Sequence, residues 1–183
     1  MGDETRCASG PVVRVVARVR LESYAEKQAR VESFRNSEWV NQPGELARIG
    51  AGILDPSTYN MKVGLSADLA DGRRITGGGF EFGGPRCGVS AIWWRYRGPR
   101  LSDDEHERLL HETYHVGRSD IEDAIDQMLG REPEQHRPPR LSWEGLQAAL
   151  IEAGVDATET QLIAAPLVIE LRPEVEAEIA RGT

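Results

Sequence analysis

The chain has 183 residues, a length typical of one domain, and 39% of them are hydrophobic. Its formal net charge is −8 and its pI is near 5.1, which argues against a protein that mainly grips a phosphate backbone. The composition also excludes fibrous, collagen-like and wholly disordered proteins. We therefore expect a globular chain with no nucleic-acid partner.

The sequence indicates neither a membrane segment nor a secretory context. No apolar run approaches the ~20 residues that span a bilayer. The first residues, MGDETRCASG, lack the charged-then-apolar order of a signal peptide. Cys7 and Cys87 form no disulfide or metal-binding pattern, so we interpret them as free thiols. These features predict a cytoplasmic protein with no membrane partner.

The first predicted element is a half-buried strand over residues 12–21. Apolar side chains alternate there with Arg14, Arg18 and Arg20, so the arginines share one face and the apolar residues the other. This arginine side could attract an acidic partner, although such a row is more often simply the solvent side of a strand.

Helix signals follow this strand. Ser23 and Glu26 have capping-box spacing, which predicts a helix over residues 24–34. Residues 36–59 contain several glycines and an Asp-Pro pair. We expect this stretch to be irregular, with at most a turn or two of helix.

Alternating apolar residues return over residues 61–97 and predict an antiparallel meander. Asp71-Gly72 favours a hairpin with a type I′ turn. The glycine triplet at 77–79 neither follows the Walker spacing nor opens a helix, so we interpret it as a site of close packing or a bulge. The strands expected after the hairpin turn cover residues 74–82 and 88–97.

The rest of the sequence is mainly helical, and capping-box spacing marks helix starts at Ser102, Ser119 and Thr158. Gly117 and Gly154 are placed to end helices in the left-handed conformation. The helix after Ser119 carries a regular apolar stripe. Its members are Ile121, Ala124, Ile125, Met128 and Leu129.

The predicted fold class is α+β, with an antiparallel sheet of about four strands, helices packed on it and a linked, mainly helical C-terminal segment. A stretch rich in proline and charge, residues 131–140, is the expected linker. It separates an α+β body, residues 1–130, from the C-terminal segment, residues 141–183, which has one possible strand over 167–171. This segment is small for an independent domain, so we expect it to dock on the body or on a partner.

One motif carries metal chemistry: His111-Glu112-x-x-His115. On a helix, two histidines four residues apart project from the same face and can bind one Zn²⁺, while the adjacent glutamate acts as general base on the metal-bound water. At these residues the chain resembles the zincin metallopeptidases. The resemblance implies zinc held by His111 and His115, with Glu112 as the catalytic residue.

A zincin also needs a third protein ligand. The metzincin pattern would place glycine at position 118 and the ligand at position 121, where this chain has Arg118 and Ile121. The gluzincin alternative takes a glutamate from a later helix, and the nearest candidates are Glu122, Glu132 and Glu134. A helical projection turns both motif histidines away from the apolar stripe, as on a solvated face. We interpret His106 and His136 as ordinary surface or packing residues.

Two capped helices joined by a short turn over residues 109–130 also fit a helix-turn-helix. The second helix, however, carries Asp120, Glu122, Asp123 and Asp126, whose carboxylates would repel phosphate.

No nucleophile paired with a base and no dinucleotide fingerprint is visible in the sequence. The leading interpretation is therefore a non-catalytic protein-binding, assembly or accessory module of the kind found in bacteria and phages. It would act on another protein or on itself and need no cofactor. The alternative is a zinc-dependent hydrolase that uses the HExxH motif.

Overall fold

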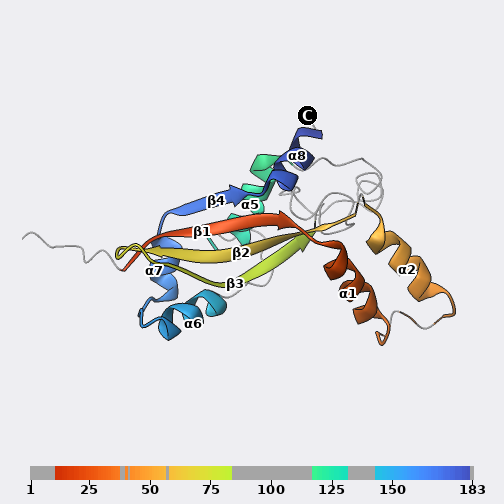
Figure 1. Ribbon diagram of the computed structural model, residues 1–183, viewed down its shortest axis with the longest axis horizontal. Helices are drawn as coiled ribbons and strands as arrows, with labels where there is room; N and C mark the ends of the chain where they lie inside the picture. The colour runs from red at the N-terminus through yellow and green to blue at the C-terminus, as the bar shows by residue number, and fades with distance from the viewer. Residues whose placement is uncertain are drawn as a thin grey trace, which may run out of the picture. The chain divides into compact units, whose positions relative to one another are not determined.

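The computed structural model describes residues 11–37, 40, 42–56, 58–83, 117–131 and 143–181, which form four strands and six helices. Their order along the chain can be followed in Figure 1. The predicted strand over 88–97 and the helix after Ser102 lie outside these residues. The elements are β1 (Val12–Leu21), α1 (Tyr24–Phe34), α2 (Glu45–Leu54), β2 (Asn60–Leu69), β3 (Arg74–Gly83), α5 (Arg118–Met128), α6 (Glu144–Glu152), α7 (Glu159–Ala164), β4 (Leu167–Leu171) and α8 (Pro173–Arg181).

The strands form one sheet in the order β3-β2-β1-β4. Strand β4 runs parallel to β1, because Val15 N–H donates to the Pro166 carbonyl and Arg172 N–H donates to the Val19 carbonyl. The arrows of β1 and β4 point the same way in Figure 1. The α+β class is confirmed, but the prediction of a purely antiparallel sheet is wrong. Helices α6 and α7 precede β4, so the chain enters β4 from a helical connection rather than from a hairpin.

The hairpin between β2 and β3 is present, but its loop differs from the predicted type I′ turn. Gly72 N–H donates to the Leu69 carbonyl, and Leu69 N–H donates to the Arg73 carbonyl. Three residues therefore form the loop, and the last of them, Gly72, has a φ of 86°. This is the three-residue hairpin in which a left-handed residue follows a β-turn.

The described residues divide into two compact units. The first contains those within 1–18, 63–80 and 125–170, and the second those within 19–62, 81–124 and 171–183. The C-terminal helices α6 and α7 thus belong to the same unit as most of β1. Most of the expected linker over 131–140 lies outside the described residues, so the division at that linker stays a prediction.

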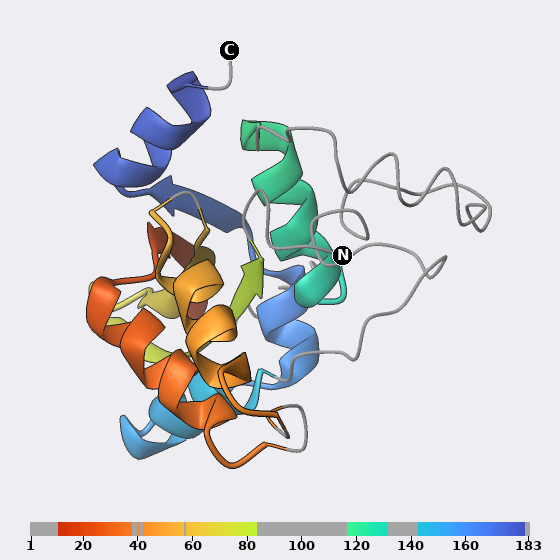
Figure 2. The same ribbon diagram turned by 90° about the vertical axis from the view of Figure 1, so that its right-hand side faces the viewer.

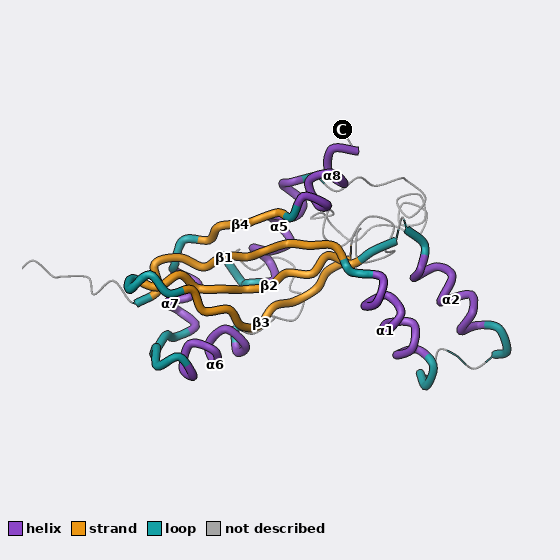
Figure 3. The backbone as a smooth tube through the Cα atoms, viewed as in Figure 1, coloured by secondary structure: helices purple, strands orange, loops and turns teal. Residues whose placement is uncertain are grey.

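In the first unit, α6 packs directly on the glycine triplet of β3 (Figure 3). A Cβ atom on Gly77 would lie 2.5 Å from the Cβ of Ala149 and 2.6 Å from the carbonyl oxygen of Gly145. Gly78 has a φ of 71°, and its Cα atom would lie 2.5 Å from a Cβ on Gly145. The predicted close packing of the triplet is confirmed, because only glycine lets these two backbones touch.

Several large apolar side chains of the C-terminal segment are fully buried, although Ile151 is 66% exposed. Trp143, Leu146, Leu150 and Leu162 are all at most 1% exposed. Gly154 has a φ of 77°, and Val155 N–H donates to the Leu150 carbonyl, which ends α6 as predicted. The capping box of Thr158 at the start of α7 is also confirmed.

Helix α5 begins earlier than the sequence predicts. The Asp120 carboxylate accepts from Gly117 N–H at 2.7 Å, so this bond lies at the start of α5, and Ser119 lies inside the helix. Gly117 is also not left-handed, contrary to prediction, because it precedes this helix start directly. The apolar stripe predicted for α5 is nevertheless confirmed, since Ile121, Ala124, Ile125, Met128 and Leu129 are buried.

In the second unit, α1 has the predicted bounds and its Ser23–Glu26 capping box. Helix α2 occupies ten residues where an irregular stretch was predicted. A Cβ on Gly50 would lie 3.3 Å from Cγ1 of Val31, so the missing side chain lets α2 lie beside α1 (Figure 2). Tertiary packing here outweighs the low helix propensity of the glycines.

Candidate functional site

The HExxH residues His111, Glu112 and His115 lie outside the described residues, as do His106 and His136. The zinc site therefore stays a prediction. Glu122 is described, and its Oε1 accepts from Nε of Arg118 at 2.8 Å. Within the described ranges, no group of three or more His, Cys, Asp or Glu side chains could hold a metal ion.

One side of the sheet in the first unit carries a cluster of five charged side chains, which we call the arginine face. Strand alternation places them on the side opposite the buried apolar row of β1 and β2. Two members come from β1 and one from each of the other strands. They are Arg14, Arg18, Asp68, Arg74 and Glu170.

Asp68 on β2 joins two arginines from the strands on either side of it. Its Oδ2 accepts from Nε of Arg14 at 2.5 Å and from Nη2 of Arg74 at 3.0 Å, and its Oδ1 accepts from Nε of Arg74 at 2.5 Å. The hydrogen bonds from Arg74, followed by the one from Arg14, hold the pKa of Asp68 well below its usual range. This carboxylate is therefore ionised across the physiological pH range.

Glu170 on β4 is the second carboxylate of the arginine face. Its Oε2 accepts from Nε and Nη2 of Arg18 at 3.1 and 2.8 Å, and its Oε1 lies 3.8 Å from Nη1 of Arg74. Among the residues that the structure describes, three guanidinium groups thus share two carboxylates, which leaves one positive charge in excess. The side chains of Arg14, Arg18 and Arg74 are 48%, 53% and 37% exposed, so this charge is presented to solvent.

Arg20, the third arginine predicted on the polar side of β1, has a different role in the second unit. Its Nη1 and Nη2 donate to the two carboxylate oxygens of Glu26 at 2.7 and 2.6 Å. The hydrogen bond from Arg20, followed by that from the backbone of Ser23, lowers the pKa of Glu26. Arg20 and Glu26 therefore form a one-to-one pair that fixes the first turn of α1.

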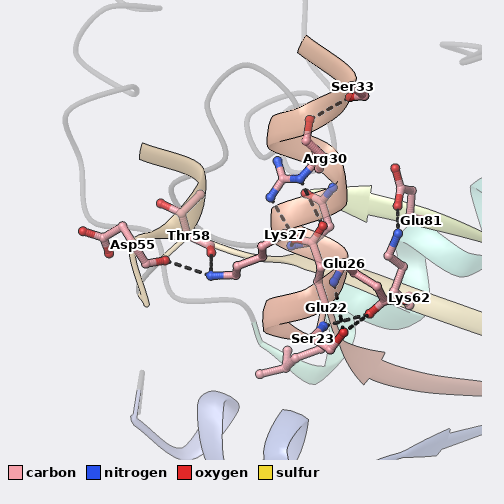
Figure 4. Close-up of polar contacts among 12 residues, drawn as sticks. Glu22, Ser23, Glu26, Lys27, Arg30, Ser33, Asp55, Thr58, Lys62 and Glu81 are labelled. Carbon is pink, nitrogen blue, oxygen red and sulfur yellow. Dashed lines mark hydrogen bonds and ion pairs between the residues drawn. The ribbon is translucent and has the colours of Figure 1, made fainter. Parts of the chain in front are cut away.

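Two further charged groups of the second unit, Glu22 just before α1 and Lys27 on α1, are paired within that unit (Figure 4). Glu22 has a side chain only 1% exposed, and it accepts from Nε and Nη2 of Arg30 at 3.0 and 2.8 Å. The buried Nζ of Lys27 donates to the carbonyls of Asp55 and Thr58. The contacts of Lys27 join α1 to the segment between α2 and β2, and the pair of Arg30 with Glu22 joins α1 to the residue that follows β1. We assign both a structural role.

The sequence singled out Arg14 and Arg18 but missed the other three members of the arginine face. Alternation along β2 places Asp68 on the polar side, and this was a usable signal. Glu170 lies 152 residues from Arg18, and no local pattern connects them. No family model, curated protein or solved structure matches this chain.

Proposed function

We propose that this chain is a non-catalytic module that binds another protein, or a second copy of itself, through the arginine face. One observation carries the proposal: in the described part of the chain, three exposed guanidinium groups lie on one side of the sheet and share two carboxylates. Arginine is enriched among the residues that dominate protein interfaces. Because neighbouring strands hold these side chains at fixed spacings, a partner meets donors that are already positioned.

The charge of the whole chain sets limits on the partner. A net charge of −8 opposes binding to a polyanion, so we propose a protein partner rather than a nucleic acid. We also propose a cytoplasmic location and no requirement for a cofactor. None of the described helices is both long and apolar enough to cross a bilayer.

The test compares two variants that change the charge equally. Arg14→Gln/Arg18→Gln removes two charges from the arginine face, and Arg35→Gln/Arg48→Gln removes two exposed charges from the second unit. Cross-linking in cells followed by mass spectrometry detects a partner, and sedimentation velocity detects self-association. We expect the wild type and the control pair to retain the partner and the face pair to lose it. A chain that sediments as a monomer and cross-links to nothing specific would reject the proposal.

The HExxH motif favours a second candidate function, a zinc-dependent peptidase of the zincin kind. It predicts about one zinc ion per chain in protein purified without added metal or a histidine tag. Zinc should be lost in His111→Ala/His115→Ala, whereas Glu112→Gln should keep zinc and lose hydrolysis. Elemental analysis tests this directly, and protein without zinc rejects it.

A further inference from the structure

We infer that the arginine face recognises the carboxylates of an acidic protein segment, with Arg14 holding the first of them. The inference rests on the proposed function, because it names the chemistry of the partner at that same surface. Unused hydrogen-bond donors, the charge balance of the face and the spacing of its arginines each support it.

Arg14 is oriented by the protein and still open to a ligand. An arginine side chain has five N–H donors, and toward the described residues Arg14 uses one of them, its Nε, which donates to Asp68. Its terminal nitrogens, Nη1 and Nη2, make no hydrogen bond to any residue that the structure describes. These two nitrogens form the fork that binds a carboxylate through two parallel hydrogen bonds. Arg14 can therefore bind a partner carboxylate while it keeps its hydrogen bond to Asp68.

Arg18 and Arg74 hold spare donors beside Glu170. Both hydrogen bonds of Arg18 go to one oxygen of Glu170, its Oε2. The other oxygen, Oε1, is 3.8 Å from Nη1 of Arg74, which is too long for a hydrogen bond. Nη1 of Arg18 and Nη1 of Arg74 thus make no hydrogen bond to the described part of the chain and can bind a second partner carboxylate.

The charge balance favours a carboxylate over a phosphate. The face has one positive charge in excess, and the carboxylates of Asp68 and Glu170 remain within it. A phosphate group brings up to two negative charges to one place beside them, whereas the carboxylates of a peptide place single charges at separate arginines. A nucleic acid would also bring a line of phosphates to a chain whose net charge is −8.

The spacing of the arginines indicates the form of the partner segment. Arg14 and Arg18 are four residues apart on β1, which corresponds to about 13 Å at ~3.3 Å per residue. An extended partner with carboxylates four residues apart matches this distance. Two adjacent carboxylates in an extended chain are only about 3.3 Å apart along it, so they cannot occupy both positions at once.

A synthetic peptide of serine and glycine with two glutamates four residues apart is the probe. We would titrate it into the full chain at low salt and follow the Nε–H signals of arginine by NMR. The signals of Arg14 and Arg18 should move, and Arg14→Gln should weaken binding by about threefold to fivefold, as expected for an exposed ion pair. Arg35→Gln/Arg48→Gln should bind like the wild type, and a peptide with adjacent glutamates should bind the wild type more weakly. Binding should also weaken at about 0.5 M salt.

Several outcomes overturn the inference. Equal affinity of the wild type and Arg14→Gln for the peptide overturns it. If Arg14→Gln does not fold, Arg18→Gln provides the same comparison. Tighter binding of inorganic phosphate or of a double-stranded oligonucleotide than of the peptide also does so. A partner that depends on the face in cells, combined with no binding of the peptide, overturns the carboxylate inference alone. A chain without any such partner rejects the proposed function itself.

Discussion

Replacing Gly77 with alanine tests the direct contact between β3 and α6. The added methyl group would lie 2.5 Å from the Cβ of Ala149 and 2.6 Å from the carbonyl oxygen of Gly145, whereas ordinary contact begins near 3.4 Å. Helix α6 must therefore move by about 1 Å from the strand. Overpacking of this size costs about 2 kcal/mol, which lowers the Tm of a chain this long by about 4–8 °C.

Thermal and urea denaturation followed by circular dichroism measure the effect. Gly64→Ala on the neighbouring strand is the matched control, because nothing lies within 4 Å of a Cβ placed there. It should change the free energy of unfolding by no more than about 0.5 kcal/mol. Ala149→Gly in the Gly77→Ala background removes one of the two short contacts, so it should destabilise less there than in the wild type. Equal melting temperatures for Gly77→Ala and Gly64→Ala would refute the close approach of α6 and β3.

Three further predictions concern charged groups. Glu22→Gln leaves the partly buried Arg30 without its carboxylate and should lower the free energy of unfolding by about 2 kcal/mol, measured by urea denaturation; no loss would mean that the pair is solvated. The hydrogen bonds that lower the pKa of Asp68 stabilise the folded state at pH values above the ordinary aspartate pKa of about 3.9. This stabilisation is lost as the pH falls through the lower pKa that Asp68 has in the folded state. Urea midpoints should therefore fall more steeply below about pH 4 in the wild type than in Asp68→Asn, and identical slopes would contradict this. Arg131 donates from Nη2 to two carbonyls near the end of α7 at 3.1 and 2.6 Å, so Arg131→Ala should speed hydrogen exchange in α7 and leave α1 unchanged.

The elements that the sequence predicted well depend on residues close together in the chain. The capping boxes of Ser23 and Thr158 join residues three apart, and the bounds of α1 follow from the first of them. The apolar alternation of β1 and β2 and the stripe of α5 are equally local. Burial agrees with the pattern at most of these positions, and the exceptions in β1 are Val13, which is 52% exposed, and Val16, which is buried although it lies on the arginine side.

Contacts between distant segments explain the elements that the sequence did not predict. Glycines in α2 suggested a loop, but Gly50 allows that helix to approach Val31 of α1. The direction of β4 depends on its pairing with β1, which begins with a bond between Val15 and Pro166. Nothing in the sequence around either strand indicates which strand it pairs with. Periodicity could therefore predict β4 as a strand but not its orientation in the sheet.

The arginine face differs from the ion pairs of the second unit in its ratio of guanidinium groups to carboxylates. In the second unit, Arg20 pairs with Glu26 and Arg30 pairs with Glu22, so each guanidinium has a carboxylate of its own. Such pairs position α1 and leave little charge for a ligand. On the arginine face, Arg74 adds a third guanidinium to two shared carboxylates. Holding four strands together would need only matched pairs, and the unmatched charge is what makes this face suited to an acidic partner.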